Sequence, residues 1–343
     1  MSCKNFYKFC QKIIGQLLIA GLLVFLFFSL SGCEFNKASK SETNQPQELE
    51  KITQKEPVLF NWTNRPVAIM IENFKKARPI SGLLKARIVY EAPVEADITR
   101  FLAIFQKDNL PTRIGPVRSA RPYFLDWAEE YNSLFVHAGG SPSALKGIRD
   151  QAYNIYNLDE ISQDGKYFFR DQDKISPHNL YSSNELIKGA FNNKEIPELN
   201  NNISGWYYKE NTKNPDKDLL GVLKIKYRQD AVWKYEKDLN RYLRYENGAK
   251  LLNDKDIQLN TSNIVIQKTK IQQIDDIGRK SIKTKGSGEV IVFKNGQVVN
   301  GFWEKLKGDK KTRFYKKNGE EIIFSPGIVW IHIVSEDSEV DYY

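Results

Sequence analysis

The chain has 343 residues, of which 41% are hydrophobic and 12% aromatic, and this composition excludes a disordered or low-complexity protein. The formal net charge is +9, and residues 1–32 hold three lysines and no acidic residue, so the remaining chain carries +6. So modest a charge, without a recognisable nucleic-acid module, argues against a nucleic-acid partner and is compatible with anionic lipid or polymer nearby. The length suffices for two domains of ordinary size.

Residues 1–32 have the layout of a bacterial lipoprotein signal peptide. Three lysines precede an apolar run from residue 13 to 30, and Ser31 and Gly32 lead into Cys33. In this layout the thiol of Cys33 receives a diacylglycerol and becomes the first residue after cleavage. The alternative is a transmembrane anchor, because the run has 18 residues, the short end of what spans a bilayer. The small residues before Cys33 favour the lipoprotein, and both interpretations place the bulk of the chain outside the cytoplasm, on a membrane face.

Cysteine and histidine usage excludes several chemistries. Cys3 and Cys10 lie in the signal peptide and Cys33 is the lipidation site, so the mature chain has no disulfide, thiol nucleophile or zinc–cysteine site. The chain has three histidines, in distant segments: His137, His178 and His332. We therefore expect no metal centre, and the sequence indicates no cofactor.

The pattern after the signal peptide predicts a tether and then an α/β domain. Residues 33–57 are polar, without apolar periodicity, and indicate a flexible tether. In residues 58–209, short continuous apolar runs, typical of strands buried on both faces, alternate with stretches of helical spacing that begin at Pro122 and Pro142. This alternation predicts an α/β N-terminal domain with a mixed sheet and helices.

The second half of the chain has a different residue pattern. Residues 210–220 are polar and predict a linker. Residues 221–336 contain β-rich runs separated by Asn-Gly pairs, which favour the positive backbone angles of tight hairpins. The pairs are Asn247-Gly248, Asn295-Gly296, Asn300-Gly301 and Asn318-Gly319. We expect a mainly β C-terminal domain.

Polar residues of the first domain gather at the ends of its apolar runs, where the ligands of open α/β sheets bind. Two arginines stand just before the helix that begins at Pro122, and the first turn of a helix attracts anions. The predicted anion cradle comprises Arg113, Arg118 and Arg121 with Glu72, Asn73, Glu91, Glu95 and Arg100. The alternative is an internal ion network, in which the glutamates neutralise the arginines.

A second junction runs from His137 through Gly139-Gly140 to Ser141. A serine nucleophile with His137 as its base is conceivable here, but the nucleophile elbow Gly-x-Ser-x-Gly is not matched, because Ser143 stands where the last glycine belongs. We therefore expect Ser141 to cap the next helix. His178 lies in a predicted turn that can face the same cleft.

Several motifs together resemble the YerB-like lipoprotein family, which carries the DUF3048 domain pair. They include RPVAIMIEN (65–73), VYEAPVE (89–95), IGPVRSARPY (114–123), HAGGS (137–141) and PHNLY (177–181), with further matches at 232–235, 242–248 and 286–288. The resemblance implies a lipid-anchored, extracytoplasmic protein of two domains from a Gram-positive bacterium, and it supplies no established activity. The chain departs from the family pattern at Phe74, where histidine is common, and at Ala96-Asp97, where glycines are common.

The leading functional expectation is a membrane-anchored lipoprotein that binds an anionic cell-envelope ligand, such as a wall polymer, or a wall-assembly protein. One alternative is an envelope hydrolase or glycan-modifying enzyme using Glu91 or Glu95 with His137. Another is a structural adaptor, which requires that the arginines and glutamates neutralise one another in a closed core. Of these classes, the sequence favours a protein that is not an enzyme.

Overall fold

The computed structural model describes residues 55–210, 220–227 and 230–343. The predicted signal peptide, Cys33, residues 33–54 of the predicted tether and residues 211–219 of the predicted linker lie outside the described residues. Residues Gln54–Tyr343 form one compact unit. Within the described ranges, no helix is long and apolar enough to cross a membrane.

The first half of the unit mixes strands and helices. Its strands are β1 (Val58–Trp62), β2 (Val67–Glu72), β3 (Ile88–Pro93), β4 (Thr99–Phe105), β5 (Leu134–His137), β6 (Tyr156–Asp159), β7 (Phe169–Arg170), β8 (Leu180–Tyr181) and β9 (Ile203–Tyr208). Its α-helices are α2 (Pro122–Glu129), α3 (Pro142–Arg149) and α4 (Asn184–Asn193). Its short 3-10 helices are η1 (Lys75–Ala77), η2 (Leu83–Lys85), η3 (Glu95–Asp97), η4 (Lys107–Asn109) and η5 (Gly165–Tyr167).

The second half, as far as it is described, consists of strands and their connections. The strands are β10 (Val222–Ile225), β11 (Ala231–Glu236), β12 (Arg241–Glu246), β13 (Ala249–Lys250), β14 (Asn260–Thr261), β15 (Asn263–Thr269), β16 (Ile271–Gln273), β17 (Lys280–Ile282), β18 (Gly286–Lys294), β19 (Gln297–Lys305), β20 (Arg313–Lys316), β21 (Val329–Ser335) and β22 (Val340–Tyr342).

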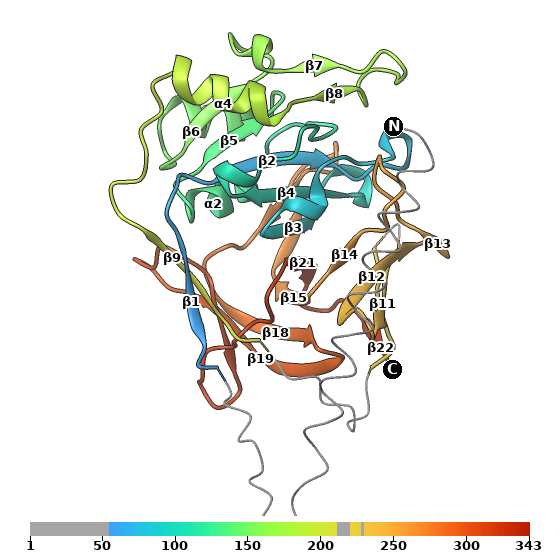
Figure 1. The fold of residues 1–343 in the computed structure, drawn as a ribbon. Coiled ribbons are helices and arrows are strands. Elements are labelled where there is room, and N and C mark those ends of the chain that lie inside the picture. The colour runs from blue at the N-terminus through green and yellow to red at the C-terminus, as the bar shows by residue number, and fades with distance from the viewer. Residues whose placement is uncertain (1–54, 211–219, 228–229) are drawn as a thin grey trace, which may run out of the picture. The chain divides into compact units, whose positions relative to one another are not determined.

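A ten-stranded mixed sheet organises the unit, in the order β20-β19-β18-β15-β21-β3-β4-β2-β5-β6 (Figure 1). Strand β21 pairs in parallel with both β15 and β3, and β5 pairs in parallel with β2 and β6. Strands β10 to β14 and β22 form a separate six-stranded sheet, and β1 pairs with β9 in a two-stranded ribbon.

Two apolar cores lie on opposite faces of the large sheet, because successive side chains of each strand point to opposite faces. On β2, Ile69 belongs to the core that includes Phe191 of α4 and Trp233 of the six-stranded sheet. Its neighbour Met70 belongs to the core that includes Trp127 of α2 and residues of β1 and β9. Every residue of β2 and β4 is buried, as expected for continuous apolar runs covered on both sides.

The expected fold class is confirmed in part. Among the described residues, the α-helices all fall in the first half and strands dominate the second. The expectation of an α/β domain followed by a separate β domain is not confirmed, because β15 and β18–β21 continue the same sheet as β2–β6. The register of β21 against β3 pairs Val329 with Ile88 and His332 with Glu91, so the sheet does not divide at the predicted linker.

Candidate functional site

The structure brings six of the predicted site residues together at the ends of β2 and β4. We call this group the arginine strip: Arg100, Arg118 and Arg121 with Glu72, Glu95 and His178. Arg100 lies on β4 directly opposite Glu72, the last residue of β2. The backbone N–H of Arg118 donates to the carbonyl of Met70 at 3.0 Å, so the segment leading into α2 runs beside the end of β2.

Glu72 is the centre of one half of the strip. Its Oε1 lies 3.4 Å from Nε of Arg118, and its Oε2 lies 2.9 Å from Nδ1 of His178. The ring of Phe74 stacks on the imidazole of His178, with centroids 5.6 Å apart. Glu72 is buried, whereas Arg118 and His178 keep 23% and 17% of their side-chain surface exposed, so this half reaches solvent through its basic members.

Arg121 and Glu95 form the other half. The guanidinium of Arg121 donates from Nε and Nη2 to the two carboxylate oxygens of Glu95, at 2.6 and 2.7 Å. Burial acts to raise the pKa of Glu95, but the hydrogen bonds and charge of Arg121 outweigh it and hold that pKa below its usual range. This bidentate pair is the geometry that arginine prefers with a carboxylate.

Arg100 lies within range of the charges of Arg118, Arg121 and Glu95, but it forms no ion pair of its own. Its Nη1 donates to the carbonyl of Ser119 at 2.7 Å, and no carboxylate oxygen of the described residues lies within 4.0 Å of its guanidinium. Burial, together with the positive charges of Arg121 and Arg118, lowers the pKa of Arg100 to about 10. Three guanidiniums therefore crowd together while only two are paired with carboxylates.

Glu91 was predicted to belong to the cradle, and the structure places it elsewhere, in a buried network. Arg244 of β12 donates to both of its oxygens at 3.0 Å, and Trp330 and Thr99 donate to them at 2.9 and 2.8 Å. The side chains of Glu91 and Arg244 are 0% and 1% exposed. Glu91 is thus fully neutralised inside the protein and is not available to a ligand.

Asn73 belongs to the same network rather than to the strip. Its side-chain amide donates to Thr99 at 2.7 Å and to Glu91 at 3.3 Å, and its oxygen accepts from Arg78 at 3.2 Å. The structure therefore uses Asn73 to connect the buried Glu91 to Arg78.

His137 and Ser141 do not form a catalytic pair. His137 is completely buried, and both ring nitrogens are occupied at 2.7 Å, one by the carbonyl of Gly139 and the other by the side-chain oxygen of Asn157. The hydroxyl of Ser141 accepts from the backbone N–H of Ala144, which makes Ser141 the N-cap of α3. The preferred interpretation of Ser141 as a cap is confirmed.

Arg113 makes contacts of its own, away from the partners of the strip. Its guanidinium pairs with Asp171 and lies 3.8 Å from the centroid of the Tyr181 ring. It shares no carboxylate with Arg118 or Arg121, so its predicted membership of the cradle has no support in its contacts.

The sequence reasoning missed Arg244 and the role of His332. On β12, alternation places Tyr242, Arg244 and Glu246 on the inward face, and a charged residue at such a position signals a buried ion pair. The second nitrogen of His332, Nε2, accepts from Nε1 of Trp233 at 3.0 Å, while Nδ1 lies 3.4 Å from Glu91. The alternation of β12 is visible in the sequence, but the sequence does not show that Arg244 meets Glu91 of β3.

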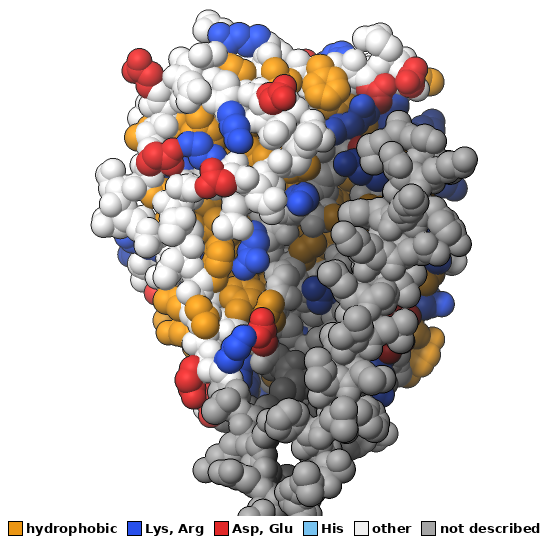
Figure 2. Space-filling model, in the orientation of Figure 1, with side chains coloured by type: hydrophobic (Ala, Val, Ile, Leu, Met, Phe, Trp, Pro, Cys, Tyr) orange, Lys and Arg blue, Asp and Glu red, His pale blue; other side chains and the backbone are white. Residues whose placement is uncertain are grey.

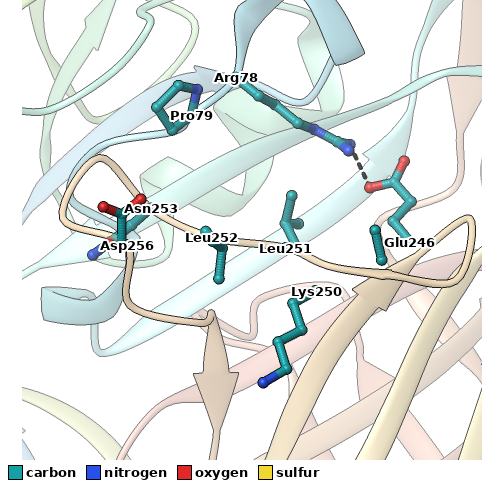
Figure 3. A pocket seen from close by; sticks show the side chains of 9 residues that line it. Arg78, Pro79, Glu246, Lys250, Leu251, Leu252, Asn253 and Asp256 are labelled. Carbon is teal, nitrogen blue, oxygen red and sulfur yellow. Dashed lines mark hydrogen bonds and ion pairs between the residues drawn. The ribbon is translucent and has the colours of Figure 1, made fainter.

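A pocket of about 390 Å³ lies near this network, between the loop after β13 and the segment around Arg78 (Figure 3). Arg78 and Glu246 face each other at one end and form an ion pair. The remaining lining residues are Pro79, Ala249, Lys250, Leu251, Leu252, Asn253 and Asp256. Burial raises the pKa of Glu246 despite the charge of Arg78. Because this pair neutralises itself, the pocket is a weaker candidate for a charged ligand than the arginine strip.

On the part of the face in Figure 2 that is not covered by grey atoms, Lys and Arg side chains are interspersed with acidic and apolar ones. Recognition of an anion on such a surface depends on a local cluster, which is what the arginine strip provides.

Comparison with known proteins connects this architecture to a family. Residues 53–197 match the "Protein of unknown function (DUF3048) N-terminal domain" and residues 223–331 match the corresponding C-terminal domain. The "Putative lipoprotein YerB" of Bacillus subtilis (strain 168) is 32% identical over 328 residues, which cover 92% of this chain and 94% of that protein. The crystal structure of YerB from Bacillus subtilis superimposes with a TM-score of 0.69 at 31% identity, over 81% of this chain and 94% of that chain. The chain therefore belongs to the YerB-like family of proteins that join the DUF3048 N-terminal and C-terminal domains.

Proposed function

We propose that the chain is a lipoprotein, anchored to the outer face of the cell membrane through Cys33, that binds an anionic ligand of the cell envelope at the arginine strip. The signal layout of residues 1–33 supports the anchor. The name of the Bacillus subtilis relative, "Putative lipoprotein YerB", supports it as well. The same layout supports the extracytoplasmic location.

One observation carries the binding proposal: the guanidinium of Arg100 forms no ion pair with a carboxylate of the described residues, although it is 6% exposed and stands beside two further arginines. Burying a charge without a partner is costly, and like charges nearby increase that cost. A bound anion relieves both effects, because it supplies the missing negative charge and accepts the unused N–H groups.

The charge balance of the strip indicates the kind of anion. Three guanidiniums face two carboxylates, which leaves one positive charge when His178 is neutral. A group with a single negative charge, such as a phosphodiester or a carboxylate, neutralises this excess. Both groups offer the paired oxygens that suit the planar guanidinium.

The alternatives have less support. An enzyme using Glu91 or Glu95 with His137 has less support, because Glu91 and His137 are enclosed and fully hydrogen-bonded and both oxygens of Glu95 accept from Arg121. The adaptor alternative is favoured by the ion pairs of Arg118 with Glu72 and of Arg121 with Glu95. It leaves Arg100 unexplained, since a closed structural network neutralises each of its buried charges.

The binding proposal is tested with the full chain in detergent micelles and two probes, synthetic poly(glycerol phosphate) and poly(glutamate), by isothermal titration. The variant Arg100→Gln removes the guanidinium that carries the proposal and leaves no lone carboxylate, because Arg100 forms no ion pair. We expect binding to the preferred probe to weaken at least about ten-fold, the loss of one charge-assisted hydrogen bond.

The control is Arg149→Gln, because Arg149 is exposed in the last turn of α3 and makes no ion pair with the described residues. This variant should bind as the wild type does. If both probes bind Arg100→Gln and the wild type equally, or if neither probe binds, the strip is not the anion site.

The anchor is tested separately, by metabolic labelling with a radioactive fatty acid. Cys33→Ala should abolish the label and leave an unprocessed precursor, because the thioether at Cys33 is the only attachment in this layout. Cys10→Ala, a change within the same signal peptide, should be labelled normally. Labelling of the Cys33 variant would exclude the lipoprotein interpretation.

A further inference from the structure

His178 is held in the orientation of a general base. Its Nδ1 lies 2.9 Å from the Glu72 carboxylate, and the ring of Phe74 packs against its face. Nε2 has no hydrogen-bond partner among the described residues, and 17% of the side chain is exposed. A carboxylate at Nδ1 fixes the proton on that nitrogen and leaves the lone pair of Nε2 free to accept a proton.

The nearby arginines place an anion within reach of this nitrogen. Arg118 shares the Glu72 carboxylate with His178, and its Nη1 donates to the carbonyl of Pro177, the residue before His178, at 3.3 Å. Nε of Arg118 is buried and faces Glu72 at 3.4 Å, whereas 23% of the side chain is exposed to solvent. An anion bound at the exposed part of this guanidinium therefore lies near the imidazole, because Arg118 reaches the residue before His178 and shares its carboxylate.

We propose, on the basis of the proposed function, that the arginine strip hydrolyses a bound phosphodiester with His178 as the general base. The oxygen of a water molecule forms a bond to phosphorus while Nε2 of His178 takes one of its protons. The ester bond between phosphorus and the leaving oxygen breaks on the opposite side of phosphorus, where solvent protonates the leaving alkoxide, and His178 releases its proton to solvent. The products are a phosphomonoester and an alcohol, and the imidazole is neutral again.

Each residue has a distinct role in this step. Arg100 and Arg118 stabilise the negative charge that grows on the phosphoryl oxygens, and they are already in place before the reaction. Glu72 is a positioning residue, which orients the imidazole and stabilises its protonated form. A phosphodiester fits better than a phosphomonoester, because it carries the single negative charge that the strip leaves unbalanced.

The test measures binding and cleavage side by side, with the full chain in detergent micelles. Bis(4-nitrophenyl) phosphate reports cleavage by release of 4-nitrophenol. Poly(glycerol phosphate) in solution and phosphatidylglycerol vesicles carry the same phosphodiester chemistry, and comparing them separates a polymer from a lipid headgroup as its source. Binding of poly(glycerol phosphate) is measured by isothermal titration.

We expect His178→Ala to cleave about 100-fold more slowly or worse at saturating substrate, and added imidazole should restore part of the rate. Glu72→Gln should lower the maximal rate, because the uncharged amide no longer stabilises the protonated imidazole. Glu72→Asp should recover part of that rate. Rescue by imidazole and by aspartate are effects that a merely structural role does not produce.

The opposite results are equally clear. A wild type that binds poly(glycerol phosphate) but cleaves none of the three substrates overturns the hydrolase proposal and leaves the binding proposal intact. Cleavage by His178→Ala at the wild-type rate also overturns it. A wild type that neither binds nor cleaves removes both proposals together.

Discussion

Glu91 lies on β3, yet the residues that neutralise it come from other strands of the unit. Arg244 comes from β12, Trp330 and His332 from β21, and Thr99 from β4. Although burial acts to raise its pKa, the charges of Arg244 and His332 and the hydrogen bonds to Arg244 and Thr99 lower the pKa of Glu91 to about 2. The carboxylate is therefore ionised throughout the physiological range.

Glu91→Gln should lower the free energy of unfolding by about 3–5 kcal/mol, because it leaves the buried charge of Arg244 without a counter-charge. Urea unfolding followed by tryptophan fluorescence measures the change. Asp150→Asn is the control, since it breaks an exposed i,i+4 pair with Lys146 and should cost no more than about 0.5 kcal/mol. Equal losses in the two variants would contradict the buried network.

Acid should destabilise the protein in two overlapping stages. Burial lowers the pKa of His332 from 6.5 to about 3, and the network lowers the pKa of Glu91 from 4.5 to about 2. In both intervals the unfolded chain binds more protons than the folded protein, so the stabilisation is complete above about pH 6.5 and decreases as the pH falls.

Urea midpoints measured between pH 7 and pH 4 test this dependence. The amide oxygen of the His332→Gln variant can still accept from Trp233. This variant should show a smaller fall of the urea midpoint between pH 6.5 and pH 4.5 than the wild type. A wild-type midpoint that stays constant down to pH 4 would show that these groups are not buried as described.

At the scale of single elements, α3 tests the distinction between a helix cap and a nucleophile. Ser141→Ala removes the side-chain acceptor for the N–H of Ala144 and should lower the free energy of unfolding by about 1 kcal/mol. Binding and cleavage at the arginine strip should stay at the wild-type level. Arg149→Ala, at an exposed position in the last turn of the same helix, is the control and should cost less. A loss of activity in Ser141→Ala at unchanged stability would contradict the cap.

The sequence predicted many elements correctly, because their signals are local. The apolar runs of β2 and β4 and the starts of α2 and α3 at Pro122 and Pro142 are found where expected. The Asn-Gly pair at 247–248 joins β12 to β13, and the pair at 295–296 joins β18 to β19, with positive φ at every one of these four residues.

The pair Asn300-Gly301 was predicted as a hairpin turn, and this prediction is wrong. Both residues lie inside β19, where Gly301 is opposite Lys316 of β20. A Cβ atom at Gly301 would lie 1.8 Å from the carbonyl oxygen of Tyr315. The glycine is needed here for the close approach of two strands rather than for a positive φ.

The site was predictable only in part, because sequence patterns report local structure but not which distant residues meet. Arginines before a helix and glutamates at strand ends are visible in one short stretch, and the pairs of Arg118 with Glu72 and Arg121 with Glu95 match the network that was considered. Arg244, the partner of Glu91, lies 153 positions away in the sequence. It belongs to β12, and the residue pattern of β12 does not show where this strand lies in the fold. Alternation shows that a strand has a buried face, but not which strand it meets.

At the scale of the whole unit, the continuous sheet predicts that the two halves depend on each other. Residues 54–210 and 220–343 produced separately should each fail to show a cooperative unfolding transition, because separation exposes the edges of β3 and β21 and leaves Glu91 and Arg244 unpaired. Co-expression of the two fragments should restore one. Circular dichroism during urea titration measures this, with the intact chain as the control. Two independently folded fragments would contradict a shared sheet.

The pairing of Glu91 with Arg244 also limits which domains can be exchanged by recombination between related chains. One member of the pair belongs to the N-terminal family domain and the other to the C-terminal one. Recombination that exchanges one domain between diverged relatives keeps this pair only if both parents carry the same two charges. It must also keep the contact surfaces of β3 and β21 compatible. We therefore expect the two domains to be inherited together, and substitutions at this contact in one domain to be accompanied by compensating substitutions in the other.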